Sequence, residues 1–147
     1  MTRISHALAA FAGLMGAAGV ALAAAAAHAE GGGLAETGAL FLILHAGALI
    51  GLVAVAAAAS REGRRALIVC GFGLGCATVL FSGDLAMRAL AGARLFPFAA
   101  PIGGTAMLLF WLAIAVIFAA GALRESSRVT ALASDRRSTQ KDDPVEL

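Results

Sequence analysis

Long apolar runs alternate with short polar connections along most of the chain. Four of these runs are close to the roughly 20 residues that a helix needs to cross a bilayer. They cover residues 6–27, 37–59, 66–91 and 101–123. Lipid cannot satisfy unpaired backbone groups, and four spans are too few to close a β-barrel, so each run is predicted to be helical. The pattern therefore predicts an all-α fold, a four-helix transmembrane bundle over residues 1–123.

The end of the chain is different. Residues 124–147 are rich in Ser, Thr, Asp and Arg and include the sequence SDRRSTQKDDP. Such a composition is typical of disordered termini. The connections at residues 28–36, 60–65 and 92–100 are too short to hold a separate soluble domain. We therefore expect one transmembrane domain, 1–123, followed by a disordered cytoplasmic tail, 124–147.

The composition agrees with a membrane protein and excludes several other classes. Hydrophobic residues make up 61% of the 147 positions and charged residues 14%, against roughly 45–50% and 25% in soluble proteins. A chain this small could not hide so much apolar surface from water. The net charge is only +2, and no basic patch is interleaved with aromatic residues, so nucleic acid is not an expected partner. The expected partners are membrane lipids and, through helix faces, other membrane proteins or a second copy.

The positive residues predict the orientation, because cytoplasmic connections carry an excess of Lys and Arg. If the N-terminus is cytoplasmic, only Arg88 and Arg94 lie outside. The other nine positive residues are then inside: Arg3, Arg61, Arg64, Arg65, Arg124, Arg128, Arg136, Arg137 and Lys141. We therefore predict a multi-pass protein of the inner (plasma) membrane with both termini in the cytoplasm.

The N-terminal run has an alternative interpretation as a cleaved signal peptide. Arg3, an apolar stretch and Ala27-His28-Ala29 before Glu30 fit the pattern of a secretory signal with an A-x-A cleavage site. The apolar stretch is about 22 residues long, however, and signal cores typically have about 7–15. Cleavage would remove residues 1–29 and leave three spans, and this alternative stays open.

Small residues within the spans predict where helices approach each other. In lipid, helices associate by close packing and a few polar contacts, and small residues four apart leave one face open to a neighbour. The fourth run also starts with a proline, which suits the first position of a helix. The predicted helix-packing residues are Gly47, Gly51, Gly71, Gly75, Pro101, Gly103 and Gly104. Packing within the chain is the first interpretation, and oligomerisation through one of these faces is the second.

Five polar residues lie within or at the border of the apolar runs and form a candidate polar cluster: His28, His45, Ser82, Asp84 and Arg88. At 1.5 Å per residue, His45 lies roughly 12 Å and Asp84 roughly 10 Å from the outer ends of their spans. Arg88 is one turn from Asp84, so the two share a helix face. The first interpretation is a polar clasp, in which Arg88 neutralises Asp84 and His45 binds Asp84 or a backbone carbonyl. A site for a small ligand, lipid headgroup or proton is the alternative.

The same residues are weak candidates for chemistry. Ser82 and Asp84 splay by about 200° on a helix, so they are poorly placed for a triad with His45. The spacing of His28, Glu30, His45 and Asp84 along the chain does not match a metal-ligand motif. The histidines are too far apart to ligate a haem. We therefore predict no catalytic residue, no cofactor and no metal.

A family resemblance rests on four short motifs. They are Ala26-Ala27-His28-Ala29, Leu44-His45-Ala46-Gly47, Leu80-Phe81-Ser82-Gly83 and Pro101-Ile102-Gly103-Gly104, followed by Trp111. With these motifs the chain resembles the YgdD-like family of small membrane proteins, known as domain of unknown function 423, over roughly residues 1–123. The resemblance implies an integral inner-membrane protein of four helices with no known enzyme activity. Asp84 departs from the Ser common in the family, and Phe110 from the glycine that usually precedes the tryptophan.

These observations together predict a non-enzymatic integral inner-membrane protein. Its abundant small residues favour a small interaction or structural subunit of the membrane. The alternative is a small transporter or a ligand- or proton-binding protein that uses the candidate polar cluster in the extracytoplasmic half. Trp111, in the middle of the fourth run, is expected to contribute to packing and not to function.

Overall fold

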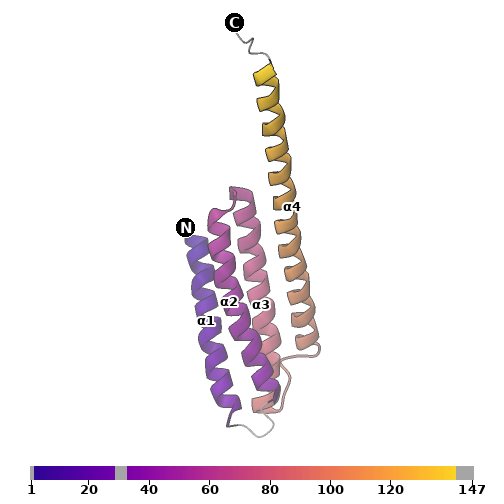
Figure 1. The fold of residues 1–147 in the computed structure, drawn as a ribbon. Coiled ribbons are helices and arrows are strands. Elements are labelled where there is room, and N and C mark those ends of the chain that lie inside the picture. Colours follow the sequence, from indigo (N-terminus) through magenta and orange to yellow (C-terminus); the bar gives the residue numbers. More distant parts are fainter. Residues whose placement is uncertain (1, 29–32, 142–147) are drawn as a thin grey trace.

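Four helices account for almost all of the molecule. The computed structural model describes residues 2–28 and 33–141. Its helices are α1 (Arg3–Ala26), α2 (Gly33–Ala58), α3 (Arg61–Ala91) and α4 (Ala99–Lys141) (Figure 1). All four are long and apolar enough to cross a membrane. The prediction of an all-α, four-helix fold is confirmed, and the chain is a multi-pass membrane protein.

The helix ends follow local side-chain chemistry. The Thr2 hydroxyl accepts a hydrogen bond from the Ser5 amide at 3.3 Å, which caps α1. The Ser60 hydroxyl accepts from the Gly63 amide at 3.2 Å and caps α3. Both bonds satisfy amides that have no partner within their own helix. Gly92 ends α3 with φ of 65°, a left-handed conformation that glycine adopts without a steric penalty.

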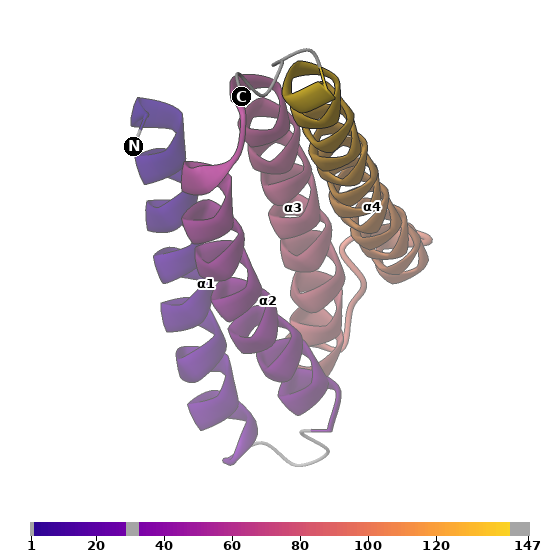
Figure 2. The same ribbon diagram turned by 45° about the horizontal axis from the view of Figure 1, so that its top comes forward.

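The helices pack in chain order, with one exception. α1 lies against α2, α2 against α3, and α3 against α4, while α1 also touches α3. In Figure 2 the helices follow one another across the molecule, and α4 flanks α3 on the side away from α1. The first three helices thus share a common core, and α4 is a peripheral helix of the bundle.

The core lies between α1, α2 and α3. Its largest fully buried apolar side chains are Leu8, Leu49, Leu67 and Leu74. Met107 and Ile114 join it from α4. Because lipid is as apolar as these side chains, their burial gains close packing more than relief from water.

The C-terminal prediction was wrong over most of its length. α4 continues as a helix to Lys141 and projects well beyond the ends of the other three (Figure 1). No Gly or Pro occurs between residues 122 and 141, and Ala, Leu and Arg there favour a helix. The hydroxyls of Ser127 and Thr130 bond to carbonyls four residues back, so they do not interrupt the helix. Residues 142–147 of the predicted tail lie outside the described part.

α4 also begins earlier than predicted. Its first residue is Ala99, so Pro101 occupies the third helical position, not the first. The missing N–H of Pro101 still costs nothing, because amides of the first turn have no partner within the helix. The preceding residue, Phe98, has φ of 70°. From this left-handed turn its carbonyl accepts from the Ile102 amide at 2.9 Å.

Candidate functional site

Asp84 is the most deeply buried ionisable residue that the structure describes. Its side chain has no exposed surface, and its Oδ2 lies 2.6 Å from Nη2 of Arg88, one turn further along α3. Its Oδ1 accepts a hydrogen bond of 2.9 Å from the Leu95 amide. The predicted pairing of Asp84 with Arg88 is confirmed. The carboxylate also fastens the α3–α4 connection to α3, a contact that the sequence did not reveal.

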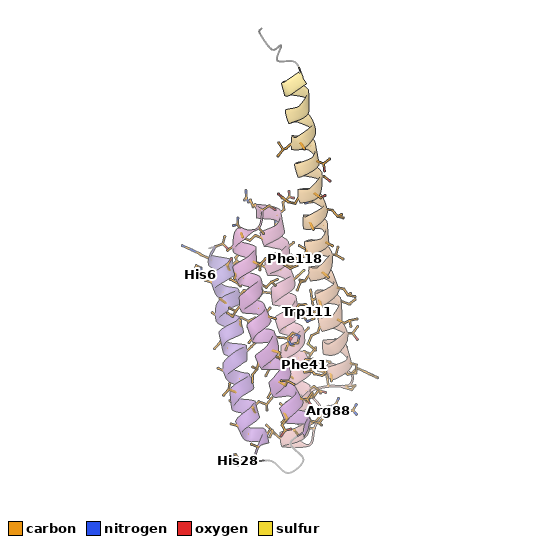
Figure 3. All side chains as sticks on the ribbon, in the orientation of Figure 1. His6, His28, Phe41, Arg88, Trp111 and Phe118 are labelled. Atoms are coloured by element: carbon orange, nitrogen blue, oxygen red, sulfur yellow. The ribbon has the colours of Figure 1, made fainter. Side chains whose placement is uncertain are left out.

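This pairing explains how a carboxylate is tolerated inside a span. An unpaired charge at the centre of a bilayer costs at least about 2.5–3.5 kcal/mol. Here the guanidinium balances the charge, and the Leu95 amide adds a donor. The Arg88 side chain remains 27% exposed, which lets its long stem reach toward the interface. Figure 3 shows Arg88 near the end of the bundle where α3 stops.

His45 takes part in a separate contact. Its Nδ1 lies 2.9 Å from the Phe41 carbonyl, so Nδ1 carries the proton and donates. Its Nε2 then accepts a hydrogen bond of 3.3 Å from Nε1 of Trp111 on α4. The prediction of a bond from His45 to a backbone carbonyl is confirmed, and within residues 2–28 and 33–141 no hydrogen bond joins His45 to Asp84. The packing expected of Trp111 includes a hydrogen bond, because its indole N–H donates to His45.

Aromatic rings extend this contact across three helices. The His45 ring stacks on Phe41 at 5.6 Å, and Phe41 lies 4.8 Å from Phe81 of α3 between ring centroids. The Trp111 ring lies 6.0 Å from His45. Figure 3 places Phe41 and Trp111 near mid-height of the bundle. The arrangement holds a neutral histidine between α2 and α4 and fixes its tautomer.

The remaining two cluster residues lie elsewhere. Ser82 is buried, and its hydroxyl has no hydrogen-bond partner within residues 2–28 and 33–141. It lies on the α2-facing side of α3, where its carbonyl would be 3.1 Å from a Cβ added to Gly38. His28 is exposed at the end of α1, as predicted for the boundary of the span (Figure 3). The five residues therefore form no common site.

This separation bears on the chemical alternatives. Ser82 and Asp84 point to different neighbours, so the triad geometry with His45 that the spacing disfavoured is not assembled. Within the part of the chain described here, no three His, Cys, Asp or Glu residues gather as metal ligands. Glu30, which the metal alternative used, lies outside the described residues. None of these contacts favours transport or ligand binding at the cluster.

The predicted packing glycines divide into two groups. A Cβ on Gly71 would meet Leu8 of α1 at 2.7 Å, and one on Gly75 would meet Phe11. A Cβ on Gly103 would lie 2.7 Å from the Phe81 backbone nitrogen, and Gly104 beside it is in ordinary contact range. These positions pack as predicted, although Pro101 is exposed.

Gly47 and Gly51 form the second group. Both are exposed, and an added Cβ would meet nothing within 4 Å at either position. The interpretation of this pair as an intrachain contact is therefore wrong. The reason is that α1 and α3 pack against the opposite side of α2, which carries Leu42, Ala46 and Leu49. Oligomerisation is the alternative that remains for this face.

A packing contact between α3 and α4 is among those that the sequence reasoning missed. The Phe110 ring of α4 occupies the space where Gly73 of α3 has no side chain. Phe110 is one of the two residues that depart from the family resemblance described above, and Gly73 lies between the two predicted packing glycines of α3. A large residue opposite a glycine on another span could signal such a contact, but the pairing needs the relative height of the two helices.

A cavity of about 770 Å³ lies at the other end of the bundle. It is bounded by the end of α2, the start of α3 and the middle of α4. Its lining residues are Val55, Ala58, Ala59, Ser60, Glu62, Gly63, Ala66, Leu67, Ile117, Phe118, Ala120, Gly121, Ala122, Arg124 and Glu125. Sequence reasoning missed this cavity, since its residues come from three separate segments.

The comparisons with known proteins agree with the resemblance. The model of the family described as "Protein of unknown function (DUF423)" matches residues 15–104. This is more than half of the chain, and the chain belongs to that family. Comparison with curated proteins and with solved structures gives no match.

Proposed function

We propose that this DUF423 protein is a non-enzymatic interaction or structural subunit of the inner membrane. The observation that carries the proposal is the open face of α2. Gly47 and Gly51 share this face with the exposed side chains of Leu40 and Leu44. Small residues flanked by large apolar ones are the usual surface for close helix–helix approach in lipid. A partner helix could reach the α2 backbone there without displacing any residue of this chain.

The polar residues support the same proposal. The Asp84 carboxylate is bound by Arg88 and the Leu95 amide, and both His45 nitrogens have partners. These groups hold α3, its connection and α4 in place. Their contacts are structural, which favours a role in assembly over a reaction.

Cross-linking in membranes tests the open face. The variant Leu44→Cys, with the rest of the chain unchanged, should cross-link to a partner or to a second copy. Gly47→Leu with Gly51→Leu should reduce that product several-fold, because the new side chains fill the approach path. Gly13→Leu is the matched control, since Gly13 of α1 is also exposed with nothing within 4 Å of an added Cβ. The proposal is contradicted if Leu44→Cys gives no cross-linked product. It is also contradicted if the amount of product is the same for Leu44→Cys alone, with the two glycine substitutions of α2, and with Gly13→Leu.

We also propose that both termini are cytoplasmic. Arg61, Arg64 and Arg65 cluster at the start of α3, at the same end of the bundle as the N-terminus, and α4 projects from that end too (Figure 1). The positive-inside tendency supports a cytoplasmic placement of this end. Reporter fusions after residue 65 should be active only as cytoplasmic reporters, and periplasmic activity there overturns the orientation.

A further inference from the structure

We propose that the cavity between the α2–α3 turn and α4 binds one phospholipid whose headgroup carries both a phosphate and a primary amine. Phosphatidylethanolamine has this chemistry. The inference depends on the membrane-spanning fold and is independent of the partner proposed for α2. It assigns an acyl chain to the cavity wall and the headgroup to the charged rim.

Small side chains on both sides create the cavity. Gly63 and Ala66 of α3 line it together with Gly121 and Ala122 of α4. At Gly121 an added Cβ would meet nothing within 4 Å. The volume of about 770 Å³ falls in the range of about 300–1,000 Å³ that is usual for ligand sites. The space is thus a consequence of the sequence, since no side chain present can fill it.

The wall of the cavity is suited to an acyl chain. Val55, Leu67, Ile117 and Phe118 supply most of its bulk. The cavity opens to the side of the bundle, since Val55 and Phe118 are 47% and 45% exposed, and these side chains offer water no polar partner. Because the cavity lies along helices that cross the bilayer, lipid tails are the apolar groups available to occupy it. Figure 3 shows Phe118 on α4 at the height of this upper part of the bundle.

The rim is suited to a zwitterionic headgroup. Arg124 ends the apolar run of α4 and lines the cavity, as do Glu62 and Glu125. An arginine fork binds phosphate oxygens well, and carboxylates accept hydrogen bonds from an ammonium group. Among the residues that line the cavity, the charged ones are one cation and two carboxylates, a set that suits a headgroup with both charges better than one that is only anionic. A quaternary amine, as in phosphatidylcholine, has no N–H to donate to the carboxylates.

Native mass spectrometry of the full chain in mild detergent tests the headgroup. Phosphatidylethanolamine, phosphatidylcholine and phosphatidylglycerol with identical acyl chains are added in separate arms. We expect one phosphatidylethanolamine per chain, with the other two bound about tenfold more weakly, as for loss of a charged hydrogen bond. Glu62→Gln with Glu125→Gln should bring phosphatidylethanolamine and phosphatidylcholine to similar affinity. Equal binding of all three lipids to the wild-type chain overturns the assignment.

A filled cavity tests the location. Gly121→Leu places a side chain in open space, so the helix should fold as before while lipid retention falls about tenfold. Gly47→Leu is the control, because that glycine is equally open but lies in the middle of α2. Lipid retention that is unchanged by Gly121→Leu, or lost equally in the control, contradicts the site. If Gly47→Leu loses the cross-link at the α2 face but retains lipid, the lipid site and the partner face are shown to be independent.

Discussion

α3 and α4 have similar apolar composition but opposite surroundings. In its most apolar stretch, 44% of the residues of α3 are buried inside the molecule, against 11% in α4. α3 lies between the other helices and meets them through Gly71, Gly75 and Gly73. α4 touches α3 along one side and exposes large side chains such as Leu108, Leu112 and Val116. In a membrane, hydropathy thus identifies a span, but only the packing of the helices shows which span the others surround.

The polar contacts of these two helices also differ. α3 holds an ionised pair, Asp84 with Arg88, and the carboxylate binds the connection that leads to α4. α4 contributes one neutral hydrogen bond, from Trp111 to His45. The central helix therefore carries the contact with the largest expected energy, and the peripheral helix a weaker one.

The largest effect is expected when Asp84 is removed. Asp84→Leu leaves Arg88 without its counter-charge and the Leu95 amide without its acceptor. Breaking a buried pair costs about 3–5 kcal/mol, and we expect about 3 because Arg88 reaches toward water. Denaturant titration in detergent micelles measures the free energy of unfolding. Asp84→Leu with Arg88→Met should recover most of the loss, and equal stability of the single and double variants would contradict the pairing.

A smaller effect is expected at the contact between α3 and α4. A Cβ on Gly103 would press on the backbone of α3, 2.7 Å from the Phe81 nitrogen and 2.9 Å from the Ala77 carbonyl oxygen. Backbone cannot move aside as a flexible side chain can, so Gly103→Ala should cost about 1–3 kcal/mol.

The neighbouring glycine provides the control for this comparison. At Gly104 the nearest atom to an added Cβ is 3.8 Å away, in the Phe81 ring. Gly104→Ala should be neutral or stabilising by up to about 1 kcal/mol, since alanine favours a helix. Thermal unfolding of both variants measures the difference. Equal melting temperatures would show that α4 is not held closely at residue 103.

The smallest effect is expected for the bond between His45 and Trp111. Hydrogen bonds between membrane helices contribute about 0.6 kcal/mol on average. A double-mutant cycle with His45→Phe and Trp111→Phe should give a coupling of that size. The aromatic replacements keep a ring at each position, so the ring contacts of residue 45 with Phe41 and with residue 111 remain and the cycle isolates the hydrogen bond. A coupling near zero would mean that the bond does not contribute to holding α4.

The candidate cluster shows where sequence reasoning succeeded. The pairing of Asp84 with Arg88 is set by a spacing of four residues on one helix, so it could be predicted. The bond of His45 to the Phe41 carbonyl is equally local. The partner of the His45 Nε2 could not be predicted, because Trp111 is 66 residues away and its height depends on how α4 packs.

The packing glycines show what the spacing of residues cannot predict about helix packing. Gly47–Gly51 and Gly71–Gly75 have the same spacing, yet only the second pair lies against another helix of the chain. Spacing indicates which residues share a face. It does not indicate which face of α2 turns toward α1 and α3, because apolar side chains surround that helix on all sides.

The sequence by itself determined the membrane-spanning character, the four helices and the internal pairing of Asp84, because apolar run length and local spacing act within one segment. Only the tertiary structure decided that α4 is peripheral, that Trp111 binds His45, and that a cavity opens beside Gly121. These features depend on the heights and rotations of separate helices, which are set by the sum of many weak contacts between them.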